Sequence, residues 1–245
     1  MVLRGDGADD ALKFIFIDEV EQPQKKPGFF GVSTLVVDSR FYCTLKVGLE
    51  QAFDHAKWSR GHEFKGRYIF SSSKGDTSVP VEARIELVRS IVGKTTAKKN
   101  ARARFYFAHN NDGKTPGNYL DLIGKAAARC PKSDSRKGDK PLVAVFFDQT
   151  DMIKPSHLEE IVRPILLKRG LTLVETPVPL ASSNATAGLI ATDVLAYLKS
   201  WDVLYPNPGE TEQASLFEAS LDKLHADKLK VIREILDLIK RVEVV

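Results

Sequence analysis

Two short apolar runs, each followed by an aspartate, constrain the fold of this chain more than any other feature of its sequence. The run PLVAVFF (141–147) is apolar throughout, is bounded by polar residues and ends at Asp148. A continuous run of this kind is typical of a strand buried on both faces of a sheet. The run KFIFI (13–17) is also of strand type and ends at Asp18. The two runs together predict a covered sheet with acidic residues at strand ends.

Strand and helix patterns alternate along the rest of the chain. GFFGVSTLVV (28–37) is rich in aromatic and β-branched residues and predicts a second strand, antiparallel to the first. Ser156 with Glu159 has the spacing of a capping box, and Pro164 predicts a kink or a break in the helix that follows. The other patterns predict helices over 41–58, 79–92, 118–129 and 187–201, strands over 101–110 and 171–175, and a long C-terminal amphipathic helix running to Val242.

This order predicts an α/β protein with a mixed sheet flanked by helices. The chain has 245 residues, of which 43% are hydrophobic and 28% charged, so it can build a sizeable core. We expect one domain over residues 1–205, with residues 206–245 as a C-terminal helical appendage that packs on the same domain.

Charge and cysteine usage narrow the class of protein further. The net charge of +4 is too small to indicate nucleic-acid or membrane binding by itself. Cys43 and Cys130 lie far apart and match neither a disulfide framework nor a zinc site, which indicates a reducing compartment. The first residues contain no long apolar region, and no stretch of eighteen apolar residues is present, so we expect a cytoplasmic protein with no leader and no membrane partner.

Several familiar catalytic motifs fail on spacing. GKTT at Gly93 and GKT at Gly113 lack the earlier glycine of a phosphate-binding loop, because Val88 and Ala108 stand at that position. The histidines show no helical pair with a glutamate between them, and no serine lies in a nucleophile elbow. The sequence therefore gives no support for nucleotide-cofactor chemistry, a zinc hydrolase or a serine hydrolase.

Four acidic residues remain at unusual positions. Asp18 and Asp148 follow apolar strands, Glu63 lies in the charged segment GHEFKGRY, and Asp193 lies inside the apolar segment GLIATDVLAYL. A buried carboxylate is costly unless a positive charge compensates it. Mg²⁺ takes oxygen ligands, and two such ions can clamp the attacking and leaving oxygens of phosphoryl transfer. The set predicts a divalent-cation site if the four side chains converge.

Each residue also has an ordinary structural interpretation. Asp18 or Asp148 alone is consistent with a turn residue or a helix cap at a strand end. Glu63 with Lys65 is consistent with a surface ion pair, and Asp193 with a residue that caps a loop or pairs with an arginine. Other ambiguous features are the aromatic residues Trp58, Tyr68 and Phe70, which stack on bases or belong to the core, and the basic segments 94–104 and 129–140, which are solvated loops or phosphate-binding patches.

The acidic residues lie in four short motifs that resemble, in order, a bacterial and phage family of uncharacterised domains in the ribonuclease H-like, or retroviral integrase, superfamily. The family pattern is a strand ending Asp-Glu-Ser-Gly, a Glu-x-Lys motif, a strand ending in Asp, and a final helix reading Gly-Leu-Gln-x-Ala-Asp. The resemblance spans about residues 13–201 and departs at two places, where Val20 and Glu21 replace Ser-Gly and Ile190 and Thr192 replace Gln and Ala. The matching segments are IFIDEV (15–20), HEFK (62–65), VFFDQT (145–150) and AGLIATDVLAYL (187–198).

The resemblance implies a ribonuclease H-like fold and a metal-dependent nuclease. It implies Asp18, Glu63, Asp148 and Asp193 as ligands of Mg²⁺ or Mn²⁺, with two ions, Lys65 near the scissile phosphate, and nucleic acid as the partner. Two alternatives stay open at this point. One is a non-catalytic module of the same fold that binds protein or nucleic acid. The other is a component of a phage-defence or toxin system, in which the C-terminal helix is an assembly surface. A homodimer through the C-terminal helix is a separate expectation.

Overall fold

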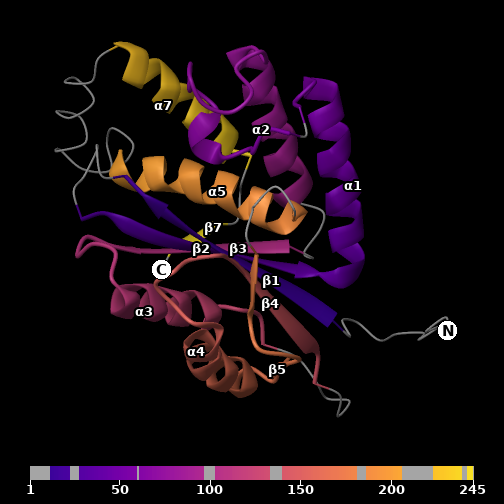
Figure 1. The fold of residues 1–245 in the computed structure, drawn as a ribbon, viewed down its shortest axis with the longest axis vertical. Coiled ribbons are helices and arrows are strands. Elements are labelled where there is room, and N and C mark those ends of the chain that lie inside the picture. The colour runs from indigo at the N-terminus through magenta and orange to yellow at the C-terminus, as the bar shows by residue number, and fades with distance from the viewer. Residues whose placement is uncertain are drawn as a thin grey trace.

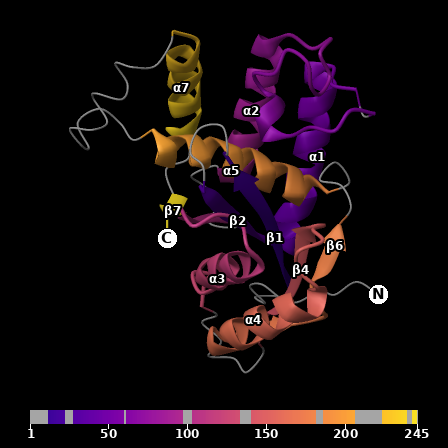
Figure 2. The same ribbon diagram turned by 60° about the vertical axis from the view of Figure 1, so that its left-hand side comes forward.

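A mixed sheet with helices on both faces forms the centre of the protein, as a computed structural model shows (Figures 1 and 2). The structure describes residues 12–22, 28–59, 61–96, 103–132, 140–180, 186–205, 223–238 and 242–244. Within these ranges, no helix is both long enough and apolar enough to span a membrane.

The strand order defines the fold class. The first three strands form an antiparallel meander, and β4 and β5 extend the sheet in parallel from the β1 side, in the order β5-β4-β1-β2-β3-β7. This is the arrangement of a ribonuclease H-like sheet, and the predicted fold class is confirmed. The strands are β1 (Leu12–Glu21), β2 (Phe30–Asp38), β3 (Ala103–Asn110), β4 (Leu142–Asp148), β5 (Thr172–Leu173), β6 (Val178–Leu180), which also pairs with β4, and β7 (Val242–Val244).

The helices cover the sheet in two layers, each with its own apolar core. Side chains alternate along β1, so that Phe16 packs in the core under α1, α2 and α5, whereas Ile15 and Ile17 pack in the core under α3 and α4. The first layer holds α1 (Ser39–Ala56), the short 3-10 helix η1 (Gly66–Tyr68), α2 (Val81–Thr96), α5 (Ala187–Leu204) and α7 (Lys223–Leu236); the second holds α3 (Pro116–Ala127) and α4 (Pro155–Lys168).

Helix α5 lies directly on the sheet. A Cβ atom at Gly188 would stand 2.3 Å from the ring of Phe16, so only glycine permits this approach. The ring of Phe16 is stacked on that of Phe146 in the neighbouring strand β4, with 5.4 Å between the two ring centroids. Almost every side of α5 is buried, which explains why its sequence is apolar all round.

Two local predictions are wrong, and a third is wrong in part. Asp18 does not end its strand, because β1 continues to Glu21 and stays paired with β2 up to that residue. Ser156 lies inside α4, whose N-cap is Lys154, so Ser156 and Glu159 form no capping box. Helix α4 also continues through Pro164 to Lys168, so this proline does not break it.

The C-terminal helix ends earlier than its apolar pattern predicts. Helix α7 ends at Leu236, and Val242–Val244 forms strand β7, which pairs in parallel with β3. The alternating valines suit an extended strand that satisfies the outer backbone groups of β3. The described part of α7 packs on α5 and α2 through buried residues such as Leu229 and Ile232. The part of the predicted helix that precedes residue 223 and much of both basic segments lie outside the described residues.

Candidate active site

Asp18 and Asp148 stand at the same level of two neighbouring parallel strands. The register of β1 and β4 pairs Phe16 with Phe146 and Ile17 with Phe147, so the two aspartates are the next residues in line. Because side chains alternate along a strand, both point to the face on which Phe16 and Phe146 stack, which is the face covered by α5.

Asp193 approaches the same region from α5. Its Oδ2 accepts a hydrogen bond of 2.5 Å from the backbone N–H of Gly66. Ser33, the partner of Asp18 in β2, has its hydroxyl 3.2 Å from the carbonyl oxygen of Asp18 and 3.4 Å from that of Thr192. These contacts connect β1, β2 and α5 at the level of the acidic side chains.

The connector between α1 and α2, residues 57–59 and 61–80, carries Glu63 and Lys65. Lys65 Nζ lies 3.2 Å from Glu63 Oε1, and their side chains are 21% and 37% exposed. The connector can approach α5 because residue 66 is glycine, since a Cβ there would stand 2.6 Å from Cβ of Tyr197. The structure thus brings the Glu-x-Lys motif next to Asp193.

Burial and mutual repulsion raise the pKa values of the aspartates. Burial raises the pKa of Asp18 well above its ordinary value, and the charges of Asp193 and Asp148 raise it further. Burial likewise raises the pKa of Asp148, against the opposing effect of Lys65. Burial raises the pKa of Asp193 to about 6, although the N–H of Gly66 and the charge of Lys65 act in the opposite direction.

Lys65 responds to the same negative charges. Burial alone would lower its pKa, but Glu63, Asp148 and Asp193 together raise it above the ordinary lysine value. Since every one of these acids acts on this ammonium group, the four carboxylates and Lys65 belong to one electrostatic group. The cations that act on the four carboxylates, Lys65, Arg67 and Lys114, are fewer than the acids, so the group is deficient in positive charge.

The donor chemistry of these residues fits a hard divalent cation, because all four offer carboxylate oxygens. Across the residues that the structure describes, however, no three His, Cys, Asp or Glu side chains are arranged so that they could hold one metal ion. The acids therefore share a region and an electrostatic field, and the structure does not show them as a formed metal site.

Glu19 and Lys114 are site neighbours that the sequence motifs did not single out. Glu19 follows Asp18 and points to the opposite face of the sheet, where Lys114 pairs with it and lies 3.0 Å from Glu21. Glu19 Oε2 is buried without a hydrogen-bond partner in the described structure. Burial raises the pKa of Glu19, which Lys114 counteracts. From the sequence, only the alternation of side chains along β1 could have predicted that Glu19 lies beside Asp18 on the opposite face. No local sequence pattern indicates that Lys114 lies near the site.

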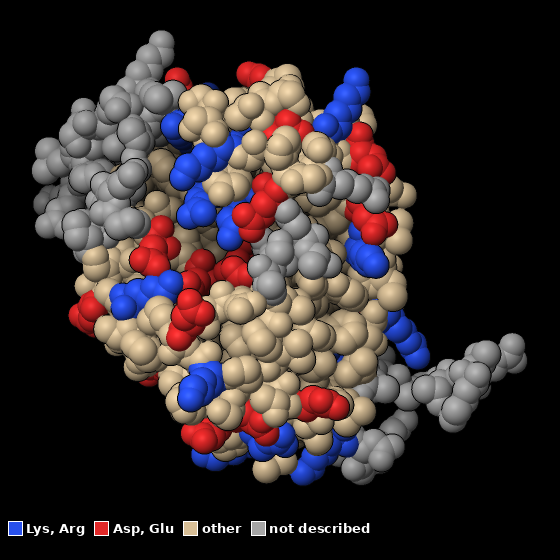
Figure 3. Space-filling model, viewed as in Figure 1, with Lys and Arg blue, Asp and Glu red and all other residues tan. Residues whose placement is uncertain are grey.

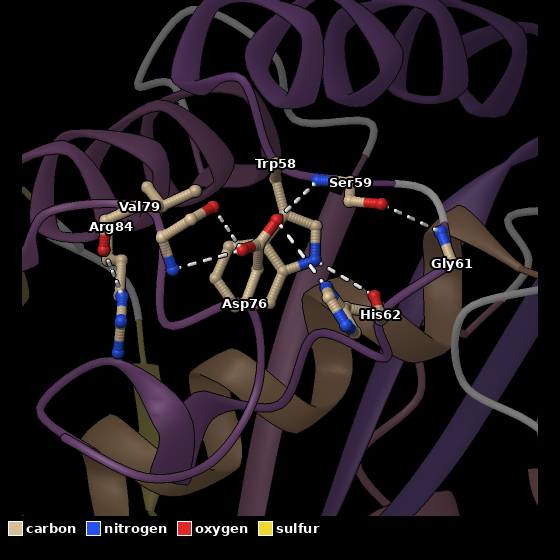
Figure 4. Close-up of polar contacts among 8 residues, drawn as sticks. Trp58, Ser59, Gly61, His62, Asp76, Val79 and Arg84 are labelled. Atoms are coloured by element: carbon tan, nitrogen blue, oxygen red, sulfur yellow. Dashed lines mark hydrogen bonds and ion pairs between the residues drawn. The ribbon is translucent and has the colours of Figure 1, made fainter.

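A second buried carboxylate, Asp76, organises the connector (Figure 4). Its Oδ2 accepts from the N–H of Ser59 at 2.9 Å, and its Oδ1 accepts from the N–H and the hydroxyl of Ser78 at 3.1 and 2.5 Å. Nδ1 of His62 lies 3.5 Å from Asp76, and the indole of Trp58 donates to the carbonyl of His62 at 2.9 Å. The hydroxyl of Ser78 and the N–H of Ser59 lower the pKa of Asp76 to about 2.

Arg84 holds the other end of the connector. This buried side chain donates to the carbonyl oxygens of Val79 at 2.8 Å, Tyr68 at 3.1 Å and Ser71 at 2.5 Å. Its guanidinium group lies 6.0 Å from the ring centre of Trp58, which is only 5% exposed. Trp58 is therefore a core residue and not a surface for stacking bases. Asp76 and Arg84 together fix the backbone that presents Glu63 and Lys65.

The surface of this region is strongly charged. Figure 3 shows acidic side chains around a hollow at the level of the sheet, with basic side chains directly above them. The grooves between α1 and α2, lined by residues such as Phe41, Gln51 and Lys94, contain none of the four acids. The acidic region is therefore separate from these grooves.

These features define an α/β protein of ribonuclease H-like fold with one buried and several half-buried acidic residues on the α5 side of the sheet. No family model and no curated protein matches the chain. Among solved structures it is similar to a mutant of Bst-RNase HIII, with 12% sequence identity, a TM-score of 0.40, and coverage of 95% of this chain and 71% of that chain. A similarity of this size carries no weight by itself, so the fold class rests on the strand order and directions.

Proposed function

We propose that this protein is a metal-dependent nuclease that hydrolyses phosphodiester bonds in nucleic acid. The proposal rests on one observation: Asp18, Asp148 and Asp193 are placed on one side of the sheet, where burial and like charges raise their pKa values. Such an arrangement is unfavourable for folding alone and is typical of a site that binds cations or transfers protons.

Asp18 and Asp148 would hold the ions, and Glu63 and Asp193 would complete their coordination. Two Mg²⁺ or Mn²⁺ ions would supply Lewis acidity and an activated water for attack on phosphorus. Lys65, held by Glu63 at 3.2 Å, would stabilise negative charge on the phosphate oxygens. The hydrogen bond from Gly66 would orient the carboxylate of Asp193.

The direct test is the substitution Asp148→Asn, with cleavage of mixed RNA and DNA substrates measured in Mg²⁺ and in Mn²⁺. We expect a loss of activity of about a hundredfold or more, since a charged ligand is replaced by a neutral amide. Asp121→Asn is the matched control, because Asp121 is an exposed residue of α3 paired with Lys125. Equal activity in Asp148→Asn and the parent, with circular dichroism unchanged, would refute the assignment.

A non-catalytic module of the same fold is the second candidate, and the departures from the family motifs at Val20, Glu21, Ile190 and Thr192 favour it. A thermal melt separates the two candidates. If the acids bind Mn²⁺, a metal concentration of about 100 times Kd stabilises the fold by roughly 2.7 kcal/mol. This stabilisation should fade as the pH falls through about 6, where Asp193 takes up a proton. An unchanged melting temperature at every pH would favour the non-catalytic module.

A further inference from the structure

A short strip of basic and aromatic side chains, formed by Arg67, Tyr68, Phe70 and Lys228, leads away from the acidic residues. We propose that this strip binds a single strand of nucleic acid and directs it to the acidic site. The inference deepens the proposed nuclease function and rests on it, because it names the class of substrate that the same site takes.

The strip begins beside the acids. Gly66 donates to Asp193, and Arg67 is the next residue along η1. The positive charge of Arg67 acts on Asp193 and lowers its pKa against the larger effect of burial. In Figure 1 the connector lies above α5, between α2 and α7, and Figure 3 shows basic side chains on this part of the surface, above the acidic hollow. A strand bound along the strip would therefore pass the acidic site.

The strip contains two pairs of a cation and an aromatic ring. The guanidinium carbon of Arg67 lies 5.3 Å from the ring centre of Tyr68, and Nζ of Lys228 lies 5.9 Å from that of Phe70. Arg67 is exposed, and the other three side chains are half-buried, so they keep part of their surface in solvent. Because Lys228 belongs to α7 and the other three residues follow α1, the strip joins segments that are far apart in the sequence.

Neither cation of the strip, Arg67 or Lys228, forms a direct ion pair among the described residues, although Arg67 lies in the field of Asp193. The hydrogen bond of Arg67 goes to the hydroxyl of Tyr68 at 3.5 Å. Other basic side chains nearby are paired, such as Lys65 with Glu63 and Lys199 with Asp202. A phosphate backbone would supply direct anionic partners for both side chains.

The aromatic members point to a single strand. Bases in a duplex are already stacked on one another, so a duplex would gain only the phosphate contacts of the cations. An unpaired strand exposes base faces that stack on aromatic rings, and this contact works with any base. The combination of basic and aromatic residues therefore fits a strand that is bound without dependence on its sequence.

The test uses the full chain in EDTA, so that binding is measured without cleavage. The probes are fluorescein-labelled single strands of about 16 nucleotides, in DNA and RNA, and the duplex of the same sequence, followed by fluorescence anisotropy. We expect the parent to bind the single strand more tightly than the duplex. Arg67→Ala and Tyr68→Leu should each weaken single-strand binding by about tenfold. Arg163→Ala, which removes an exposed arginine of α4, is the matched control and should bind like the parent.

An abasic strand separates stacking from charge. The parent should bind it more weakly than the normal strand, and Tyr68→Leu should show a smaller difference between the two strands, because one of the two rings that stack on bases is gone. Arg67→Ala should reduce the slope of log affinity against log salt by about one phosphate contact. The inference is overturned if the parent binds the duplex at least as tightly as the single strand, or if both variants bind like the parent.

Cleavage assays distinguish this inference from the nuclease proposal. Asp148→Asn should bind the single strand like the parent while losing cleavage. If the protein cleaves a duplex at a rate that Arg67→Ala leaves unchanged, the strand-binding role of the strip is contradicted and the nuclease proposal is supported. If the parent binds the single strand but cleaves no substrate in Mg²⁺ or Mn²⁺, the nuclease proposal is contradicted and the strip is supported as a binding site.

Discussion

Two buried carboxylates on the same side of the sheet, Asp18 and Asp76, are 3% and 4% exposed, yet their pKa values move in opposite directions. Asp76 accepts from two backbone N–H groups and a hydroxyl, which lower its pKa to about 2. Asp18 accepts from the N–H of Glu19 at 2.7 Å but faces Asp193 and Asp148, and its pKa is raised. Burial alone therefore does not decide the charge state of an acid, and the surrounding donors and charges do.

The opposite pKa shifts of Asp76 and Asp18 have opposite effects on the stability of the folded protein. The ionised form of Asp76 is favoured by folding, so it stabilises the protein above its unfolded pKa of about 4 and loses this effect as the pH falls toward 2. Asp18 and Asp193 bind a proton more tightly in the folded state, so they destabilise the protein increasingly as the pH rises from about 4 to 6 and beyond. The contacts of Asp76 therefore stabilise the connector, whereas the ionised carboxylates of Asp18 and Asp193 destabilise the folded protein.

The largest effect is expected from Asp76→Ala, which would leave the N–H groups of Ser59 and Ser78 without their acceptor. We expect the free energy of unfolding at pH 7 to fall by about 3 kcal/mol, measured by urea denaturation. Asp121→Ala, which removes an exposed carboxylate, should change it by no more than about 0.5 kcal/mol. Similar losses in the two variants would show that the Asp76 cluster is not a structural one.

A smaller effect is expected from Gly66→Ala, which tests whether the two clusters depend on the same connector. The new Cβ would meet Tyr197 at 2.6 Å and the carbonyl of Asp193 at 3.2 Å, so the connector must move away from α5. We expect a loss of about 2 kcal/mol in the free energy of unfolding and a larger fractional loss of cleavage, because Lys65 moves with the connector.

The control for this substitution is Gly117→Ala in α3. A Cβ at Gly117 has no neighbouring atom within 4 Å, so this variant should be neutral or slightly stabilised. If Gly66→Ala keeps full stability and full cleavage, the contact between the connector and α5 does not position the acidic site.

The smallest effect is expected from Asp18→Asn, and its sign is opposite. Removing one like charge should raise the free energy of unfolding by about 1 kcal/mol at pH 7 in EDTA. The gain should disappear near pH 4, where the parent carries a proton at this site. Urea denaturation at the two pH values measures both quantities, and a loss of stability at pH 7 would contradict the electrostatic account of the acids.

Much of the fold could be predicted because it is encoded locally. The apolar runs predict β1 and β4, the apolar segment around Asp193 predicts the buried helix α5, and the antiparallel pairing of β1 with β2 is confirmed. Strand β7 was missed because its partner, β3, is more than a hundred residues away in the sequence. The prediction of the domain boundary after residue 205, like those of dimerisation, location and phage defence, stays a prediction.

The residues of the site likewise fall into those that the sequence motifs predict and those that they do not. The motifs single out Asp18, Glu63, Asp148 and Asp193, and the structure brings them into one electrostatic group, while their role as metal ligands stays a proposal. Residues that support the site could not be found from motifs. Asp76 stands in a polar segment like many surface loops, Arg84 lies on an ordinary amphipathic helix, and Lys114 meets Glu19 from 95 positions away.

The contact between Gly188 and Phe16 gives the site a spacer. The bare backbone of α5 rests on an aromatic ring, and the same helix carries Asp193 while the same strand carries Asp18. The distance between α5 and the sheet is therefore set by the ring of Phe16, which stands two residues before Asp18. A change in the size of residue 16 would tune how far apart the two acids stand, without altering either of them.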